Sequence, residues 1–145
     1  MGSQLHRTVE QRLRRARSRY TRGRRQLVDL LADAGRPVTI GELLDRGSGL
    51  SQSSVYRNLQ VLEQAGAVRR LVTATDPGAR FELAEDLTSH HHHLICNVCG
   101  GIEDLQPSAP IERAVARLTS ELAAADRFAT EQHRLDLVGT CADCR

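Results

Sequence analysis

Four cysteines in two Cys-x-x-Cys pairs constrain this chain more strongly than any other feature of its sequence. Cys96 and Cys99 form the first pair, and Cys141 and Cys144 form the second. In a cytoplasmic protein such pairs are typical of zinc sites, because each turn presents two thiolates and two turns complete a tetrahedral shell. The alternatives are two redox dithiols or a disulfide framework, and a reducing compartment disfavours the framework. We therefore predict structural zinc, the removal of which would unfold its domain.

The gap between the two pairs is long enough to hold a helix. Pro110 can begin this helix, and apolar residues at helical spacing follow it. They are Ile111, Val115, Leu118 and Leu122. Zinc would then tie a C-terminal strand to a strand and turn near residue 96.

The length and composition fit a folded protein of one or two small domains. The chain has 145 residues, of which 40% are hydrophobic and 26% are charged, and domains commonly contain about 100 to 150 residues. No apolar run approaches the roughly 18 residues of a membrane span, and no apolar segment follows the arginine-rich N-terminus. We expect a cytoplasmic protein. The 3% aromatic content argues against binding single-stranded nucleic acid on stacked rings.

The net charge of +2 conceals two halves of opposite sign. Residues 1–72 contain 14 Arg and six acidic residues, a balance of +8, and residues 73–145 contain six Arg and 12 acidic residues, a balance of −6. A basic half favours a polyanion, and the planar fork of Arg suits phosphate. Because the acidic half holds all four cysteines and five of the six histidines, we expect a metal cation there.

The basic half has the pattern of a winged helix-turn-helix. Nine arginines and one acid lie between Arg7 and Arg25, which is typical of a solvated tail or of an arm that contacts DNA. Three helices and a hairpin are predicted after this run. In order they are a helix ending at Gly35, a helix opened by a capping box at residues 39–42, a helix from near Ser51 to Gly66, and strands at 68–73 and 80–83 around Asp76-Pro77-Gly78. In a winged helix the last helix enters the DNA major groove.

The third of these helices has one apolar face and one polar face. Val55, Leu59 and Leu62 share the first. The candidate DNA-contact residues on the other face are Ser53, Tyr56, Arg57 and Gln60, joined by Tyr20 and Arg22 from the arginine run. Arg can bond guanine with two hydrogen bonds, Gln can recognise adenine, and Tyr can contact a thymine methyl or a phosphate. An amphipathic helix whose polar face meets only water is the alternative. The arginine run and the hairpin favour DNA binding.

A run of four histidines, His90 to His93, indicates further metal binding. The run leads directly into Leu94-Ile95-Cys96, which is typical of a strand. Alternate side chains of a strand point to opposite faces, so the run would form two pairs, His90 with His92 and His91 with His93. Each pair needs further ligands, and imidazole suits zinc, iron, nickel or cobalt. The candidate ligands are Glu112 and His133 for the first pair and Glu82 for the second. A solvated polyhistidine stretch is the alternative.

Together these segments resemble the ferric uptake regulator family of bacterial metal-dependent repressors, from about Tyr20 to Arg145. The most specific matches are SVYRNL at 54–59, HHHHLICNVCG at 90–100 and GTCADC at 139–144. The resemblance implies an α+β protein in which a winged helix-turn-helix precedes a small α/β dimerisation domain with a structural zinc site of four cysteines. The implied boundaries are 1–83 for the DNA-binding domain with its arginine-rich arm, 84–89 for a hinge and 90–145 for the metal-binding domain.

The resemblance also implies three metal sites. The ligand sets are Cys96, Cys99, Cys141 and Cys144 for structural zinc; His90, His92, Glu112 and His133 within the dimerisation domain; and Glu82, His91 and His93 for a regulatory site between the domains. The chain departs from the family pattern at Pro37, where iron- and peroxide-sensing members carry a further His ligand. It also departs at Arg69 and Ala84, near which zinc-sensing members carry Asp and Cys. The segment from Cys99 to Glu112 is one residue longer than usual.

The function that the resemblance implies is a homodimeric repressor that binds double-stranded, palindromic DNA when zinc or Fe²⁺ occupies the regulatory site. The histidine run and GTCADC resemble the zinc uptake regulator branch, whereas Phe81-Glu82-Leu83 resembles iron-sensing members. Zinc is our first choice, and an iron- or peroxide-responsive repressor is the alternative. A zinc hydrolase would need a nucleophile or general-base motif that we do not find. A metal-storage protein would leave the basic half unexplained.

Overall fold

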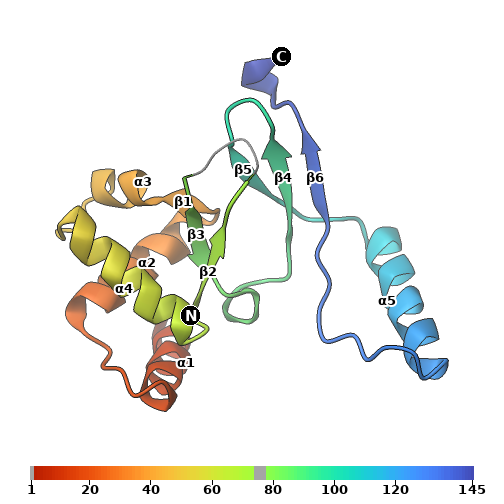
Figure 1. Cartoon of the computed structure of the whole chain (residues 1–145), viewed down its shortest axis with the longest axis horizontal. Helices are drawn as coiled ribbons and strands as arrows, with labels where there is room; N and C mark the ends of the chain where they lie inside the picture. The colour runs from red at the N-terminus through yellow and green to blue at the C-terminus, as the bar shows by residue number, and fades with distance from the viewer. Residues whose placement is uncertain (1, 74–77) are drawn as a thin grey trace.

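The computed structural model describes residues 2–73 and 78–145, which form two lobes (Figure 1). The N-terminal lobe contains α1 (Gly2–Arg15), α2 (Arg22–Ala34), β1 (Val38–Thr39), α3 (Ile40–Asp45), α4 (Gln52–Gln64), β2 (Val68–Leu71) and β3 (Arg80–Leu83). A 3₁₀ turn, η1 (Glu85–Leu87), leads to the C-terminal lobe. That lobe contains β4 (His92–Cys96), β5 (Ile102–Leu105), α5 (Ala109–Ala124), β6 (Asp136–Gly139) and a second 3₁₀ turn, η2 (Ala142–Cys144).

Local capping signals set the helices of the N-terminal lobe, as predicted. The capping box is present at α3, where the Thr39 hydroxyl accepts from the Glu42 backbone N–H and the Glu42 carboxylate accepts from the Thr39 N–H. The Ser51 hydroxyl caps α4 by accepting from the Ser54 N–H. Gly35 ends α2 in the left-handed region, with φ of 58°, where a side chain would be strained. The turns therefore fall where the sequence indicates.

A three-stranded antiparallel sheet in the order β1-β3-β2 forms the wing. Arg70 of β2 lies opposite Phe81 of β3, which confirms the predicted hairpin. The first strand ends at Leu71 rather than at residue 73. Asp76 and Pro77 of the predicted turn lie outside the described residues.

The expectation of an N-terminal arm or solvated tail is wrong for the first part of the arginine run, because residues 2–15, which hold four of its nine arginines, form α1. Val9 and Leu13 of this helix are completely buried in the core of the N-terminal lobe, and each such side chain stabilises the fold by about 2 kcal/mol. The Arg12 guanidinium donates to the Gly66 carbonyl and pairs with Asp86 of η1. The first helix is thus part of the domain.

The C-terminal lobe has a second three-stranded sheet, in the order β5-β4-β6. β4 pairs antiparallel with β5 and parallel with β6, with Cys96 opposite Gly139. The predicted helix is α5, with Pro110 in its first turn, but in the described chain it buries none of its residues. Ile111 and Leu118 of α5, with Leu137 and Val138 of β6, remain 46–67% exposed.

Among the described residues, the large apolar cluster therefore lies in the N-terminal lobe, and the C-terminal lobe buries only a few apolar residues, such as Ile102. Every member of the buried apolar cluster lies between Val9 and Leu83. The architecture is the predicted α+β fold of a winged helix-turn-helix followed by a small sheet domain. Within the described ranges, no helix has both the length and the apolar character that a bilayer crossing requires.

Candidate metal sites and recognition helix

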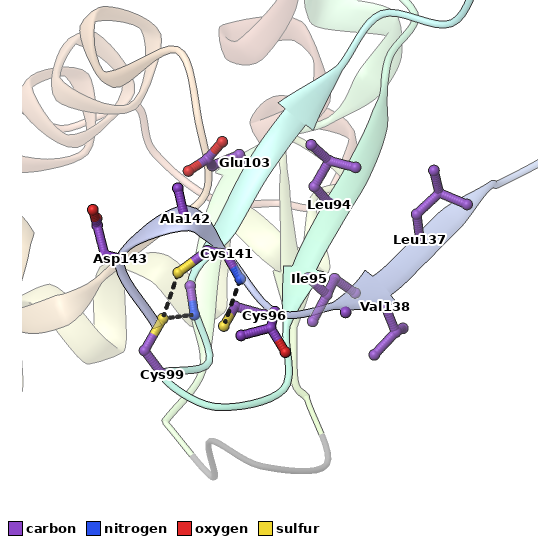
Figure 2. A pocket seen from close by; sticks show the side chains of 13 residues that line it. Leu94, Ile95, Cys96, Cys99, Glu103, Leu137, Val138, Cys141, Ala142 and Asp143 are labelled. Atoms are coloured by element: carbon purple, nitrogen blue, oxygen red, sulfur yellow. Dashed lines mark hydrogen bonds between the residues drawn. The ribbon is translucent and has the colours of Figure 1, made fainter. Parts of the chain in front are cut away.

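The cysteine cluster, Cys96, Cys99, Cys141 and Cys144, lies at one end of the C-terminal sheet. Parallel pairing of β4 and β6 brings the two turns together, and the Asn97 N–H donates to the Gly139 carbonyl at 2.8 Å. Figure 2 shows Cys99 and Cys141 pointing toward each other, with their sulfurs 3.9 Å apart. All four sulfurs lie within 4.8 Å of one another. Thiolates on a tetrahedral zinc would be about 3.8 Å apart, since Zn–S bonds are about 2.3 Å long, so the cluster fits zinc.

The sulfurs of this cluster differ in how readily they lose a proton. Backbone N–H groups of Cys141, Cys99 and Val98 lower the pKa of the Cys96 thiol to about 6. The pKa of Cys144 is raised to about 12, first by its hydrogen bond with Cys141 and then by burial. One sulfur is therefore ready to bind a cation, and four thiolates at this spacing need a cation to hold them.

The helix cluster joins His90 and His92 to Glu112 of α5 and to His133, which precedes β6. His92 Nε2 lies 2.9 Å from Glu112 Oε1, and His90 Nε2 lies 3.1 Å from His133 Nε2. Nitrogen and oxygen ligands of a tetrahedral zinc would be about 3.3 Å apart. The hydrogen bond from His92 lowers the pKa of Glu112. These four residues, predicted as one set, are thus brought together within ligand distance.

The interdomain cluster joins Glu82 of β3 to His91, His93 and Asp104. The Nε2 atoms of His91 and His93 each lie 3.2 Å from Glu82 Oε2, and His91 Nε2 lies 4.0 Å from Asp104 Oδ1. Glu82, His91 and His93 are at most 8% exposed. Because Glu82 comes from the wing and the other three come from the C-terminal lobe, this cluster spans the two lobes (Figure 1).

Asp104 is the member of this cluster that sequence reasoning missed. It lies on β5 directly opposite His93. The pKa of Asp104 is raised by burial, although the positive charge of His91 opposes this rise. The available signal was an acid in a strand next to the histidine strand, but sequence alone does not give the pairing register. Asp104 could supply the fourth ligand that Pro37 cannot. A cavity of about 230 Å³ between Gly35, Arg36 and Asp104 borders the cluster on that side.

Hydrogen bonds to the second ring nitrogens distinguish the two histidine clusters. In the interdomain cluster His91 Nδ1 donates to the Ser89 carbonyl at 2.8 Å, and His93 Nδ1 lies 3.4 Å from Asp136 Oδ1. When neutral, both rings therefore present unprotonated Nε2 atoms to the centre, the usual second-sphere arrangement of metal-binding histidines. In the helix cluster His92 Nδ1 instead accepts from the Leu135 N–H at 3.2 Å. A neutral His92 consequently carries its proton on Nε2, facing Glu112.

The buried carboxylate of Glu82 is charged in the metal-free protein. Burial acts to raise its pKa, but hydrogen bonds from His93 and His91 outweigh burial and lower it. The pKa of His91 is raised: burial opposes this, while hydrogen bonds to the Ser89 carbonyl and Glu82 and the charge of Asp104 favour it. A cation at the centre would displace the proton that protonated His91 donates from Nε2 to Glu82.

The predicted recognition face of α4 is exposed. Ser53, Tyr56, Arg57 and Gln60 all face solvent, Tyr56 at 43% exposure. Gln60 Nε2 donates to the Tyr56 hydroxyl at 3.4 Å. A nearby residue not singled out from the sequence, Asn58, accepts from Arg24 Nε at 3.0 Å and ties α4 to α2.

The two remaining candidates for DNA contact differ from each other. Arg22 is exposed at the start of α2. Tyr20 is half-buried, with its hydroxyl 2.6 Å from His6 Nδ1 and the Arg25 guanidinium 4.7 Å above its ring. Burial raises the pKa of Tyr20 to about 12. Arg22 is thus available to a phosphate, whereas Tyr20 already joins α1 to α2.

Comparisons with known proteins agree on one family. The family model described as the ferric uptake regulator family matches residues 15–138. The peroxide-responsive repressor PerR of Staphylococcus aureus (strain USA300) is 31% identical over 139 residues, which are 92% of this chain and 86% of the relative.

Solved structures give the same result. The ferric uptake regulator Fur of Helicobacter pylori has a TM-score of 0.74 at 23% identity, covering 99% of this chain and 93% of its own, and shows the likeness of fold. The Vibrio cholerae ferric uptake regulator (TM-score 0.66, 27% identity, 91% and 98% coverage) and a zinc-bound manganese uptake regulator (0.64, 28%, 92% and 98%) are also similar.

Proposed function

Because this chain belongs to the ferric uptake regulator family, we propose that it is a homodimeric repressor whose DNA binding depends on a metal ion in the interdomain cluster. Membership makes this chain a metal-responsive transcriptional regulator and not an enzyme. Regulators of this family bind DNA and are dimeric. The finer proposal concerns which residues bind the regulatory metal ion and which metal that is. The observation that carries it is the position of Glu82, a wing residue among three candidate ligands of the other lobe.

The interdomain cluster suits a switch because its ligands come from both sides of the proposed hinge at residues 84–89. An ion held by Glu82, His91, His93 and Asp104 would cross-link the wing to the C-terminal sheet. The wing would then hold α4 in one orientation relative to the rest of the dimer. A ligand shifts such an equilibrium only by its preference for one arrangement, and Glu82 completes the site only when the lobes are together.

DNA contact is assigned to the exposed face of α4 and to arginines at the start of α2. Arg57 and Gln60 would contact base edges in the major groove, and Arg22 would contact phosphate. Two such helices in a dimer would meet successive half-sites of a palindrome. The surplus of arginine in the N-terminal half supports this interface, since phosphate contacts supply most of the nonspecific affinity.

The dimer interface is assigned to the apolar side of the C-terminal lobe. Leu137 and Val138 of β6 and Leu118 of α5 are at least half exposed in a single chain. A groove of about 430 Å³ next to the cysteine cluster is lined by Leu94, Leu137 and Val138 (Figure 2). Covering this surface with a second chain would give the lobe the core that it lacks alone.

The cysteine cluster is proposed as the structural site. The turn that follows Cys99 contacts the wing, since Arg80 Nε donates to the Gly100 carbonyl at 3.0 Å. Zinc held by the four cysteines would keep β4 and β6 together, and β4 with the residues just before it carries four of the five histidines of the two other clusters. The helix cluster is proposed as a second metal site within the same lobe.

Zinc is proposed for the interdomain cluster, with Fe²⁺ as the alternative. The described residues place two nitrogen and two oxygen ligands around the centre, a complete shell for tetrahedral zinc. Fe²⁺ prefers more ligands and would need water from the adjacent 230 Å³ cavity. The 31% identity to a peroxide-responsive repressor supports the alternative.

The test is a gel shift on the protein's own promoter. Protein that keeps zinc in the cysteine cluster is titrated onto the DNA with and without added Zn²⁺ or Fe²⁺. We expect metal to strengthen binding by at least about tenfold, the scale of a 1.4 kcal/mol coupling, and Asp104→Ala to abolish the difference. Arg57→Ala should weaken binding under all conditions without changing metal uptake. Equal affinity with and without metal would refute the proposal.

A further inference from the structure

One oxygen of the interdomain cluster has no ordinary hydrogen-bond partner. Glu82 Oε2 faces the two histidines, but Oε1 is the buried side-chain atom that stays unsatisfied within residues 2–73 and 78–145. The nearest cation is the guanidinium of Arg69, on the neighbouring strand β2, with Nη1 3.8 Å from Oε1. Such a buried acceptor is costly unless a positive charge compensates it.

Arg69 is shared with a second carboxylate. Its Nη1 lies 3.7 Å from Glu85 Oε2, almost the same distance as from Glu82. The other oxygen of Glu85 contacts His90 Nδ1 of the helix cluster. The guanidinium thus lies between two carboxylates: Glu82, which belongs to the interdomain cluster, and Glu85, which contacts the helix cluster. A cavity of about 750 Å³ beside Arg69, Glu85, His90 and His133 leaves space for it to move.

We propose that Arg69 is a built-in counter-cation of Glu82 that competes with the metal ion and sets the metal affinity of the interdomain cluster. Glu85 modulates this competition by drawing the same guanidinium away from Glu82. The inference rests on the proposed function, because it assigns the interdomain cluster as a metal site. It makes Arg69 a positioning residue, acting on the metal through the carboxylate that it neutralises.

The direction of the effect follows from charge. In the metal-free protein Arg69 stabilises the carboxylate that a metal would otherwise neutralise, so it favours the empty site. With metal bound through Oε2, the guanidinium also lies a few ångströms from a dication and repels it. Removing the positive charge should therefore tighten binding, by about tenfold on the scale of second-sphere effects. A merely structural arginine would have the opposite effect, since its loss would loosen the cluster.

Glu85 provides a test of opposite sign. In Glu85→Gln the guanidinium loses its second anionic partner, and its remaining attraction is to Glu82. The interdomain site should then bind zinc about threefold more weakly, a smaller change than the loss of a whole charge beside the ligand. Arg70, the next residue of the same strand, is exposed and gives a matched control of equal charge. Arg69→Lys, which keeps the charge, should stay close to wild type.

The experiment is a zinc titration of the full chain, with the cysteine cluster already filled, against a chromophoric chelator. We expect Arg69→Gln to tighten the interdomain site about tenfold, Glu85→Gln to weaken it, and Arg70→Gln and Arg69→Lys to change it less than about twofold. In a His91→Ala, His93→Ala background the effect of Arg69→Gln should vanish, since the site has lost its imidazoles.

The outcomes separate the two proposals. If wild-type protein takes up zinc at the cysteine cluster but not at the interdomain cluster, the proposed function itself fails. If wild type fills the interdomain site and Arg69→Gln binds zinc equally or more weakly, only the role of Arg69 is overturned. Should Arg69→Gln fail to fold, Glu85→Gln decides: unchanged or tighter interdomain binding in that variant contradicts the competition.

Discussion

One run of four histidines supplies two residues to each histidine cluster, yet the two clusters differ in burial and in proton position. In the interdomain cluster His91 and His93 are buried, and their Nδ1 atoms face a carbonyl and a carboxylate. In the helix cluster His90 is exposed, and His92 Nδ1 accepts from a backbone N–H. The first cluster is preorganised for a cation, whereas the second must give up a hydrogen bond before His92 Nε2 can bind one. The alternation of the strand decides which histidines share a face. The hydrogen-bond partner of each Nδ1 atom decides whether the Nε2 atom of the same ring is free to bind a metal ion.

The largest expected effect comes from disrupting the cysteine cluster, which holds together the sheet that supports both histidine clusters. Cys96→Ser, or removal of zinc by a strong chelator, should unfold the C-terminal lobe, since structural zinc contributes about 10–16 kcal/mol in small zinc domains. Amide exchange and circular dichroism would show loss of the β4–β6 sheet while the N-terminal lobe, which has its own core, persists. Val98→Ser, in the same turn and 62% exposed, is the control. A native C-terminal lobe in the metal-free protein would contradict the structural role.

The next prediction separates the clusters directly. Asp104→Ala should weaken the first equivalent of zinc beyond the cysteine cluster by about a hundredfold, because it removes one of four ligands from a preorganised site. Glu112→Ala should leave that equivalent within about threefold of wild type. Competition titrations of the two variants measure both effects. If Glu112→Ala had the larger effect, the assignment of the tighter site would be reversed.

A third prediction addresses the tautomer of His92. Leu135→Pro removes the N–H that His92 Nδ1 accepts, so the ring becomes free to carry its proton on Nδ1 and to offer Nε2 to metal. The helix cluster should then bind zinc up to about tenfold more tightly. Leu135→Ala keeps the N–H and serves as the control. Equal affinities in the two variants would show that this hydrogen bond does not restrain the site.

The smallest effect is that of pH on the interdomain cluster. Because the pKa of His91 is raised, its ring stays protonated at pH values somewhat above the ordinary pKa of histidine. Metal must displace that proton in order to bind. Zinc affinity there should increase with pH, by less than about tenfold per unit, until His91 is neutral. Isothermal titration at several pH values measures the proton released. An affinity independent of pH across this range would exclude a protonated His91 in the metal-free state.

When zinc fills the cysteine cluster and the interdomain cluster is empty, His91 and Glu82 both stabilise the protein, with opposite dependence on pH. The raised pKa of His91 gives stabilisation that is present below its unfolded pKa and is lost as the pH rises through its folded pKa. The lowered pKa of Glu82 gives stabilisation that is present above its unfolded pKa and is lost as the pH falls through its folded pKa. Protein with zinc in the cysteine cluster alone should therefore be most stable between the two pKa ranges.

Much of the fold and site follows from local patterns in the sequence. The capping box at Thr39, the faces of α4 and the alternation of the histidine run each depend on a fixed period, and the structure confirms all three placements. The helix α1 was missed because the density of arginine concealed Leu5, Val9 and Leu13, which recur every fourth residue. Asp104 was missed because its role depends on the register between β4 and β5, which no local pattern specifies. The unburied stripe of α5 reflects a core that one chain does not complete.

The measurement closest to the central claim couples metal content to DNA affinity in one sample. Protein with zinc in the cysteine cluster alone is titrated with Zn²⁺ while its binding to fluorescent promoter DNA is followed by anisotropy, and bound metal is counted at each step. We predict that DNA affinity increases at least about tenfold as the interdomain cluster fills, and that Asp104→Ala shows no such increase. DNA affinity that is already maximal before this ion binds, or that increases equally in Asp104→Ala, would contradict the claim that the interdomain cluster controls DNA binding.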